Sequence, residues 1–152
     1  VDVINECIAQ AVEADGILLG SPTYFSDVTA EMKAFIDRVG YVALANGDLL
    51  AGKVGAAISA VRRAGSQHVI NTMHHFFSIQ QMPIATSTYW NMVYGAAAGE
   101  VEYDVEGMQT LDNLGENMAW LMKCIDAGKG TIPPPATERS RQMNFIRLEA
   151  ES

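Results

Sequence analysis

The feature that most constrains the fold is a short apolar run, Ile17-Leu18-Leu19-Gly20, in which apolar and polar residues do not alternate. A strand that is apolar on both faces is typical of a parallel sheet covered by helices on both sides. An amphipathic helical pattern precedes this run over residues 1–14, and a second follows over residues 32–39, where Gly40 is expected to end it. This order of helix and strand predicts an α/β fold with right-handed crossovers.

The alternation continues along the chain. A strand of small residues is predicted at residues 53–59, so another group must pack closely against it. A helical stripe at residues 69–77 follows, and then a third strand at residues 82–87. The stretch over residues 88–107 is expected to be irregular, with its acids in a solvated loop or hairpin. The last long helix uses apolar residues between 111 and 125 and is predicted to end at Gly128 or Gly130.

Composition narrows the class of protein. The chain has 152 residues, 49% of them hydrophobic, which fits a single domain over residues 1–152 with an extended tail at residues 133–152. Its formal charge of −8 argues against a nucleic-acid partner. No apolar run approaches the roughly 20 residues of a membrane span, so we expect neither a membrane segment nor a signal peptide. Cys7 and Cys124 are predicted to be buried small hydrophobes, as in a cytoplasmic protein.

Three loops follow the predicted strands, at residues 21–27, 60–67 and 87–95. Ligands of parallel α/β sheets bind outside the carboxyl ends of the strands, so these loops are the candidate site. They are rich in Ser, Thr, Gly and aromatic residues and hold no obvious acid–base pair, which favours a flat bound molecule over hydrolysis. We therefore assign no catalytic residue. The only histidines are expected to be structural rather than metal ligands, and no metal site is predicted: His68, His74 and His75.

Motifs in and around these loops carry a resemblance to a known family. They are GSPTYF at residues 20–25, KAFIDR at 33–38, AVRRAG at 60–65 and YWNMVYG at 89–95. In this order they resemble the flavodoxin-like NAD(P)H-dependent FMN reductases and iron–sulfur flavoproteins. The related quinone reductases of the tryptophan-repressor-binding-protein type are also similar. The resemblance implies a three-layer flavodoxin-like sandwich around a parallel sheet with strand order 2-1-3-4-5.

The same resemblance implies FMN as the cofactor, NAD(P)H as the co-substrate, and a quinone or similar small molecule as the electron acceptor. It places the first loop along the flavin ring and ribityl chain, and the second around the pyrimidine end, where arginine would stabilise negative charge. The third loop would lie near the dimethylbenzene edge and a partner subunit. The residues so implicated in cofactor binding are Pro22, Thr23, Tyr24, Phe25, Ser59, Ala60, Val61, Arg62, Arg63, Gly65, Ser66, Tyr89 and Trp90.

Each loop also has a structural interpretation. The first is explained as a strand-to-helix connection in which Ser26, Asp27 or Thr29 caps the helix. The paired arginines of the second loop are commonly found in a solvated turn. A different ligand role is also open to them, as partners for the phosphates of the nicotinamide donor. Clustered aromatic residues such as those of the third loop commonly fill cores and interfaces.

One departure from the family stands at the start of the chain. The family opens with a strand and an FMN phosphate loop, and nothing before Val1 matches them. We therefore expect that the first two strands are lacking and that the sheet has a long unpaired edge. The alternative function is a non-enzymatic, oligomerising remnant that has lost FMN phosphate binding. The family implies a homodimer or homotetramer, and we expect Met143, Phe145 and Ile146 of the tail to reach a partner subunit.

Overall fold

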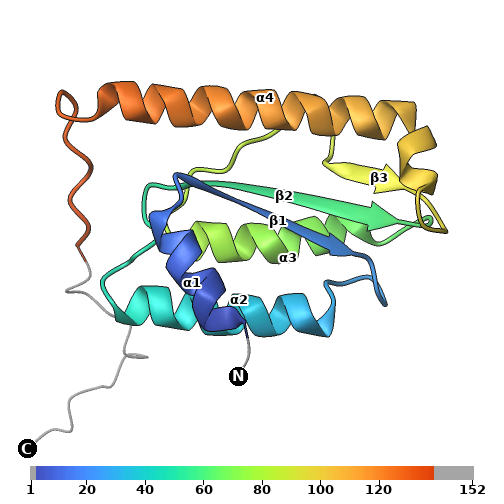
Figure 1. The fold of residues 1–152 in the computed structure, drawn as a ribbon, viewed down its shortest axis with the longest axis horizontal. Coiled ribbons are helices and arrows are strands. Elements are labelled where there is room, and N and C mark those ends of the chain that lie inside the picture. Colours follow the sequence, from blue (N-terminus) through green and yellow to red (C-terminus); the bar gives the residue numbers. More distant parts are fainter. Residues whose placement is uncertain (1–2, 139–152) are drawn as a thin grey trace, which may run out of the picture.

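The structure, a computed structural model, describes residues 3–138 and shows a parallel sheet between two layers of helices (Figure 1). Its strands are β1 (Gly16–Pro22), β2 (Val54–Val61) and β3 (Met92–Tyr94), in the order β1-β2-β3. The register between β1 and β2 starts where Gly16 pairs with Val54. Both neighbouring pairs are parallel, so the carboxyl ends of all three strands lie at the same end of the sheet.

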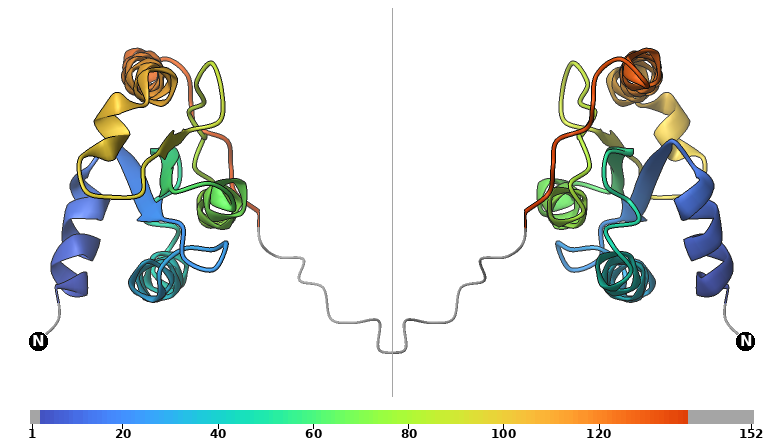
Figure 2. Two further views of the ribbon diagram at one scale, coloured as in Figure 1. Left: turned by 90° about the vertical axis from the view of Figure 1, so that its right-hand side faces the viewer. Right: turned by 90° about the vertical axis from the view of Figure 1, so that its left-hand side faces the viewer.

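Helices cover both faces of this sheet (Figure 2). They are α1 (Ile4–Glu13), α2 (Ala30–Ala45), α3 (Ser66–Ile79) and α4 (Val105–Gly128), with a short 3-10 helix η1 (Glu100–Tyr103) before α4. Helix α4 lies alone on one face, and the other three helices lie on the opposite face. Two apolar cores result, one on each side of β2.

Strand β2 separates the two cores because its side chains alternate. Ala57 belongs to the core under α3, where Met73 and Phe77 are fully buried. Ala56 belongs to the core under α4, together with Leu114. The small residues of β2 admit large neighbours, as the sequence predicts: a Cβ on Gly55 would lie 2.6 Å from ring carbons of Phe77.

The expected helices are present, but one boundary is wrong. Of the three N-cap candidates, Ser26, Asp27 and Thr29, it is Thr29 that caps α2: its side-chain oxygen accepts a hydrogen bond from the Met32 N–H at 3.2 Å. Gly40, expected to end this helix, lies inside it, and the helix continues to Ala45. Phe76 of α3 packs beside Gly40, and Gln80 Nε2 donates to the Gly40 carbonyl at 3.1 Å. That packing compensates for the helix propensity that glycine lacks.

The third strand is also misplaced in the sequence prediction. Residues 82–87 form only an isolated bridge at Ile84, and Pro83 contributes a carbonyl there but has no N–H to donate. The chain then leaves the sheet and returns as β3, which lies within the stretch expected to be irregular. The edge strand is therefore interrupted, and residues 86–91 form a loop between its two parts.

Other local predictions need correction. The acids between 100 and 106 lie in η1 and the start of α4 rather than in a loop or hairpin. Cys124 is exposed and Cys7 is only partly buried, so they are not buried core residues. The last helix does end at Gly128, as predicted. The start of the tail, up to residue 138, has no regular structure, and its apolar residues Met143, Phe145 and Ile146 lie outside the described part.

The edge of the sheet at β1 is the exposed edge that the sequence predicts. Within residues 3–138, β1 pairs with β2 and with no other strand. Leu18 on this strand is 53% exposed, which is unusual for leucine in a strand between two helical layers. The sheet is thus open on the side away from β3.

Candidate functional site

The first loop at the carboxyl ends of the strands is a tight turn with unusual backbone geometry. Tyr24 and Asp27 exchange two backbone hydrogen bonds, of 3.0 and 3.1 Å. Between them, Phe25 has φ 50° and Ser26 has φ 63°, so two consecutive non-glycine residues adopt the left-handed conformation. Such strain persists where surrounding structure imposes it, and it concentrates at functional sites. It also leaves the Phe25 side chain fully exposed.

The second loop packs directly against this turn. The Thr23 N–H donates to the Ala60 carbonyl at 2.9 Å, and the hydroxyls of Thr23 and Ser59 lie 3.1 Å apart. Gly65 has φ 96°, and a Cβ there would lie 2.9 Å from both Cα and Oγ of Ser26. Glycine is therefore needed at this position for both its backbone conformation and its close approach. The two predicted loops form one connected surface.

This surface presents hydrogen-bond donors that the protein itself does not use. Within residues 3–138, no hydrogen bond involves the backbone N–H of Phe25, Ser26, Arg63 or Ala64. Arg62 and Arg63 are exposed, and neither guanidinium pairs with an acid in that part of the chain. Helix α3 begins just behind them, without a side-chain cap at Gly65. Its positive end adds to a potential that favours acceptor or anionic groups.

Asp27 connects the first loop to α3. Its Oδ1 accepts hydrogen bonds from the Thr72 hydroxyl at 2.8 Å and from the Val28 N–H at 2.7 Å. Its Oδ2 lies 3.5 Å from Nε2 of His68. The Thr72 and Val28 hydrogen bonds, in that order, hold the pKa of Asp27 below its usual value. The carboxylate thus stays ionised and fixes the strained turn to the helix.

The acids that follow β3 serve the backbone rather than a ligand. Glu100 accepts from the N–H groups of Ala96 and Ala97 at 2.7 and 3.0 Å, and these bonds lower its pKa. Asp104 caps α4 by accepting from the Gly107 N–H at 3.0 Å, and its other oxygen accepts from the Tyr94 N–H. These carboxylates are therefore structural. Within residues 3–138, no three His, Cys, Asp or Glu side chains cluster in a way that would hold a metal ion.

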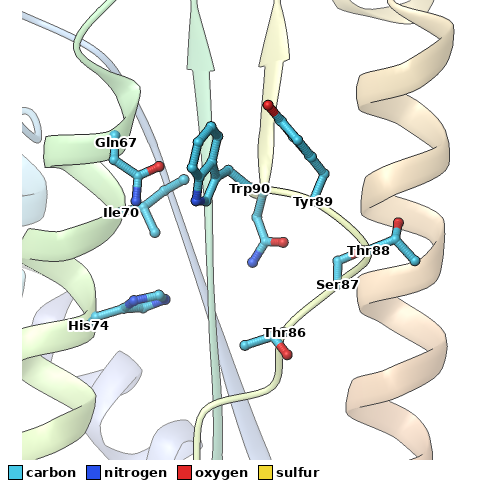
Figure 3. A pocket seen from close by; sticks show the side chains of 9 residues that line it. Gln67, Ile70, His74, Thr86, Ser87, Thr88, Tyr89 and Trp90 are labelled. Atoms are coloured by element: carbon cyan, nitrogen blue, oxygen red, sulfur yellow. The ribbon is translucent and has the colours of Figure 1, made fainter.

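The third predicted loop contributes to a different cavity. Tyr89 and Trp90 stand side by side, with ring centroids 4.8 Å apart at an angle of 61°. They line a cavity of about 430 Å³ together with α3 residues that include Gln67 and His74 (Figure 3). None of the residues from the first loop lines it. The structure therefore brings together the first and second loops and places the aromatic pair in a neighbouring cavity.

Sequence reasoning missed several residues of these sites. The sequence predicts a helix-capping role alone for Asp27, whereas in the structure this residue joins the turn to α3. The sequence gives no sign of the role of Thr72, because a polar residue on a helix does not indicate its partner, here Asp27, 45 residues away. The sequence predicts a structural His74; in the fold this residue lines the second cavity, and its Nε2 is buried without a hydrogen-bond partner. The unpaired ring nitrogen becomes visible only in the fold.

The comparisons with known proteins agree with this architecture. Residues 1–97 match the family described as NADPH-dependent FMN reductase. The chain belongs to this family. The resemblance that the loop motifs carry is thereby confirmed.

Two curated proteins are similar to this chain in sequence. An iron–sulfur flavoprotein from Methanocaldococcus jannaschii is 36% identical over 82% of the chain and 67% of its own length. An NAD(P)H dehydrogenase (quinone) from Trichlorobacter lovleyi is 26% identical over 86% of the chain and 57% of its own length. The chain thus spans between about half and two thirds of the length of these relatives.

The fold also matches a solved structure. The Trp repressor binding protein from Bacillus subtilis superposes with a TM-score of 0.59 at 16% identity, over 76% of the chain and 70% of that protein. The α/β, flavodoxin-like fold predicted for this chain is therefore confirmed. None of the helices within residues 3–138 is both long and apolar enough to cross a membrane.

Proposed function

We propose that this chain carries the flavin-ring site of an FMN-dependent NAD(P)H oxidoreductase that passes electrons to a quinone or similar small acceptor. The observation that carries the proposal is the set of unused backbone N–H groups beside an exposed aromatic ring at the carboxyl ends of the strands. The family and the names of its relatives support the same activity.

The residues of the first two loops fit a flavin. An isoalloxazine ring offers hydrogen-bond acceptors along one edge and a flat apolar face. The free N–H groups of Phe25, Ser26, Arg63 and Ala64 are complementary to such acceptors, because all four are donors without an internal partner. The exposed rings of Tyr24 and Phe25 supply area for stacking. We assign the ring contacts to Pro22, Thr23, Tyr24 and Phe25 and to the second loop from Arg62 to Ser66.

Each group then has a defined task. FMN held by these loops would supply the chemistry of hydride transfer from NAD(P)H and of electron transfer to the acceptor. Arg62 and Arg63 stabilise negative charge at the pyrimidine edge of the ring, since fixed charges placed before the reaction need no reorganisation. Ser59, Ala60 and Val61 hold the loops together through Thr23 and the sheet, so we assign them a positioning role beside the cofactor. A contact of Tyr89 or Trp90 with the flavin stays a prediction.

Flavin titration tests the proposal. Purified protein is titrated with FMN and with riboflavin, which shares the ring but lacks the phosphate, and the visible flavin spectrum is recorded. We expect a saturable perturbation with both, followed by bleaching when NADPH or NADH is added without oxygen. A spectrum that stays that of free flavin at saturating concentrations would refute a ring site built from these loops.

Matched variants assign the effect to the loops. Arg62→Gln removes one charge at the proposed site, and Lys123→Gln removes one from the exposed surface of α4, next to Met122, which packs against Gly16 at the start of β1. We expect Arg62→Gln to weaken FMN binding by about three- to tenfold, as for one hydrogen bond of ordinary net strength, about 0.6–1.4 kcal/mol. Lys123→Gln should leave it unchanged. Equal effects of the two substitutions would mean that only net charge matters.

We also propose that the protein is a cytoplasmic homodimer or homotetramer. Large apolar side chains such as Tyr41 and Ile79 are exposed beside a groove between α2 and α3. Both cysteines are free, which is typical of a reducing compartment. Light scattering coupled to size-exclusion chromatography gives the mass directly, and a monomer at micromolar concentration would contradict the assembly.

A further inference from the structure

The groove between α2 and α3 is an apolar hollow on the layer of helices opposite α4 (Figure 2). It has a volume of about 450 Å³, and its apolar lining comes from both helices. Gly40 is part of the lining and contributes no side chain that would fill the hollow. The exposed surface of α2 and α3 around this groove is termed the α2–α3 face. An exposed apolar surface of this kind marks a site at which another molecule binds.

Two large side chains project from the α2–α3 face. Tyr41 is 77% exposed and Ile79 is 59% exposed, although both also line the groove. A small molecule inside the groove would leave these projecting side chains in water. A protein partner would bury them together with the hollow, because a protein brings a surface of its own. The face combines a projection with a hollow, and this shape fits a protein partner.

The charges of the α2–α3 face select which protein partner it fits. Helix α2 carries two acids and two bases, and α3 carries no charged residue apart from its histidines. The Lys33 ammonium lies 2.6 Å from the Asp37 carboxylate, so the two charges that line the groove neutralise each other. By contrast, α4 carries four acids and one lysine, and α1 carries two acids and no base. In a chain of net charge −8, the α2–α3 face is the helical surface at which a second, equally acidic copy meets the least repulsion.

The α2–α3 face is large enough for a specific contact. Helix α2 has 16 residues, so it is about 24 Å long, and two packed helices are about 20 Å wide. The face therefore measures roughly 500 Å² on each copy and about 1,000 Å² for a pair, which reaches the lower size of specific interfaces. Because projection and hollow lie on the same face, a two-fold axis perpendicular to that face would bring Tyr41 of each copy to the hollow of the other.

We propose that the α2–α3 face is a two-fold contact at which this chain pairs with a second copy, with Tyr41 of each copy seated in the groove of the other. This inference rests on the assembly proposed above and specifies its interface. Two explanations compete with it: the chain's own C-terminal residues 139–152 cover the groove, or the copies meet through another face. Each gives a different result in the experiments below.

Matched tyrosine variants test the contact by light scattering coupled to size-exclusion chromatography. Tyr41→Asp places a charge on the α2–α3 face. Tyr103→Asp makes the same change in η1, at a tyrosine that is 85% exposed and lies outside the face. We expect Tyr41→Asp to halve the mass of the assembly and to weaken association at least about a hundredfold, because the contact loses one aromatic anchor from each copy. Tyr103→Asp should leave the mass unchanged.

An NMR dilution series of the ¹⁵N-labelled, unmodified protein tests the same contact. The backbone N–H signals of Gly40 and Ile79 report on the α2–α3 face. Those of Gly115 and Trp120 report on the exposed surface of α4. We expect the first pair to shift with protein concentration, following the same Kd as the mass, and the second pair to stay fixed. This series decides the question even where Tyr41→Asp fails to fold.

A substitution in the tail tests the chain's own C-terminal segment as the occupant. Phe145→Ser removes a large apolar side chain from residues 139–152 in the full-length chain. We expect it to change neither the mass nor the concentration dependence of the Gly40 signal. A Gly40 signal that moves in Phe145→Ser at every concentration, with the mass unaltered, would assign the groove to the tail and overturn the proposal.

The remaining outcomes separate the interface from the assembly. An assembly whose mass survives Tyr41→Asp, with α4 signals that shift on dilution in place of Gly40, puts the contact on another face and overturns this proposal alone. A protein that is monomeric at micromolar concentration overturns both the interface and the assembly. Failure of FMN to bind would refute the proposed flavin site and leave the α2–α3 contact standing.

Discussion

Gly65 is the residue on which the geometry of the two loops depends most, and replacing it with alanine gives a quantitative test. Its φ of 96° costs an L-residue about 1–2 kcal/mol. The new Cβ would also lie 2.9 Å from Cα and Oγ of Ser26 and 3.0 Å from Cγ2 of Thr23. Because Ser26 presents backbone there, something must shift, and overpacking of this kind costs about 1–3 kcal/mol more.

Gly47→Ala separates these two costs. Gly47 has φ 85°, close to that of Gly65, but nothing lies within 4 Å of the Cβ position. We therefore expect Gly47→Ala to lower the free energy of unfolding by about 1–2 kcal/mol and Gly65→Ala by about 2–5 kcal/mol. Urea unfolding measures both, and the difference in Tm should be at least about 2 °C.

The two substitutions should also differ in flavin binding. Gly65→Ala displaces Ser26 or Thr23, and with them the unused N–H groups of the turn, so we expect FMN affinity to fall about tenfold or more, or about 1.4 kcal/mol. Gly47 lies at the C-terminal end of α2 and should not affect binding. The reasoning is refuted if Gly65→Ala destabilises the protein no more than Gly47→Ala, because the close approach of the loops would then carry no cost.

Three further substitutions test the fold around the site. Gly55→Ala should lower the free energy of unfolding by about 1–3 kcal/mol, measured in urea, because its Cβ would lie 2.6 Å from the fully buried ring of Phe77. Thr29→Ala removes the N-cap of α2 and should cost about 1 kcal/mol, seen as a lower unfolding midpoint. Since the pKa of Asp27 is depressed below 3.8, its stabilisation is complete above that pH and is lost as the pH falls through the folded-state pKa. Thr72→Val should therefore destabilise the protein at pH 7 and progressively less on acidification below pH 4, and a pH-independent difference would contradict this role.

The alternation of helix and strand was predictable because it depends on local periodicity. The apolar run that includes Leu19 and the small residues around Gly55 predict a parallel sheet, and both lie in one, although Leu18 in the first run is exposed at the open edge. The edge strand was not predictable in the same way. Its interruption at residues 86–91 depends on hydrogen bonds to α4, which follows later in the chain. Likewise, Gly40 did not end its helix because Gln80, 40 residues away, packs on it.

The candidate site was predictable in position but not in detail. Parallel topology places the first two loops together, and the contacts among Thr23, Ser59 and Ala60 follow from it. The third loop was grouped with them on topology alone, and the interruption of the edge strand moves Tyr89 and Trp90 to another cavity. That cavity is lined by His74 of α3 and by Asn91, which have no sequence pattern in common. Such convergence is a property of tertiary packing.

The interrupted edge strand has a consequence for how this scaffold can change. Ile84 and β3 each pair with β2 independently, and the Ser59 N–H donates to the Asn91 carbonyl just before β3, so the ladder does not rely on residues 86–90. Insertions, deletions or grafted sequences at residues 86–90 would alter one wall of a cavity without shifting the register of the sheet. The loop at residues 60–65 lacks this freedom, because Gly65 touches the turn opposite. We therefore expect changes to this chain to be tolerated in the loop that interrupts the edge strand, and we expect the loop at residues 60–65 to tolerate few.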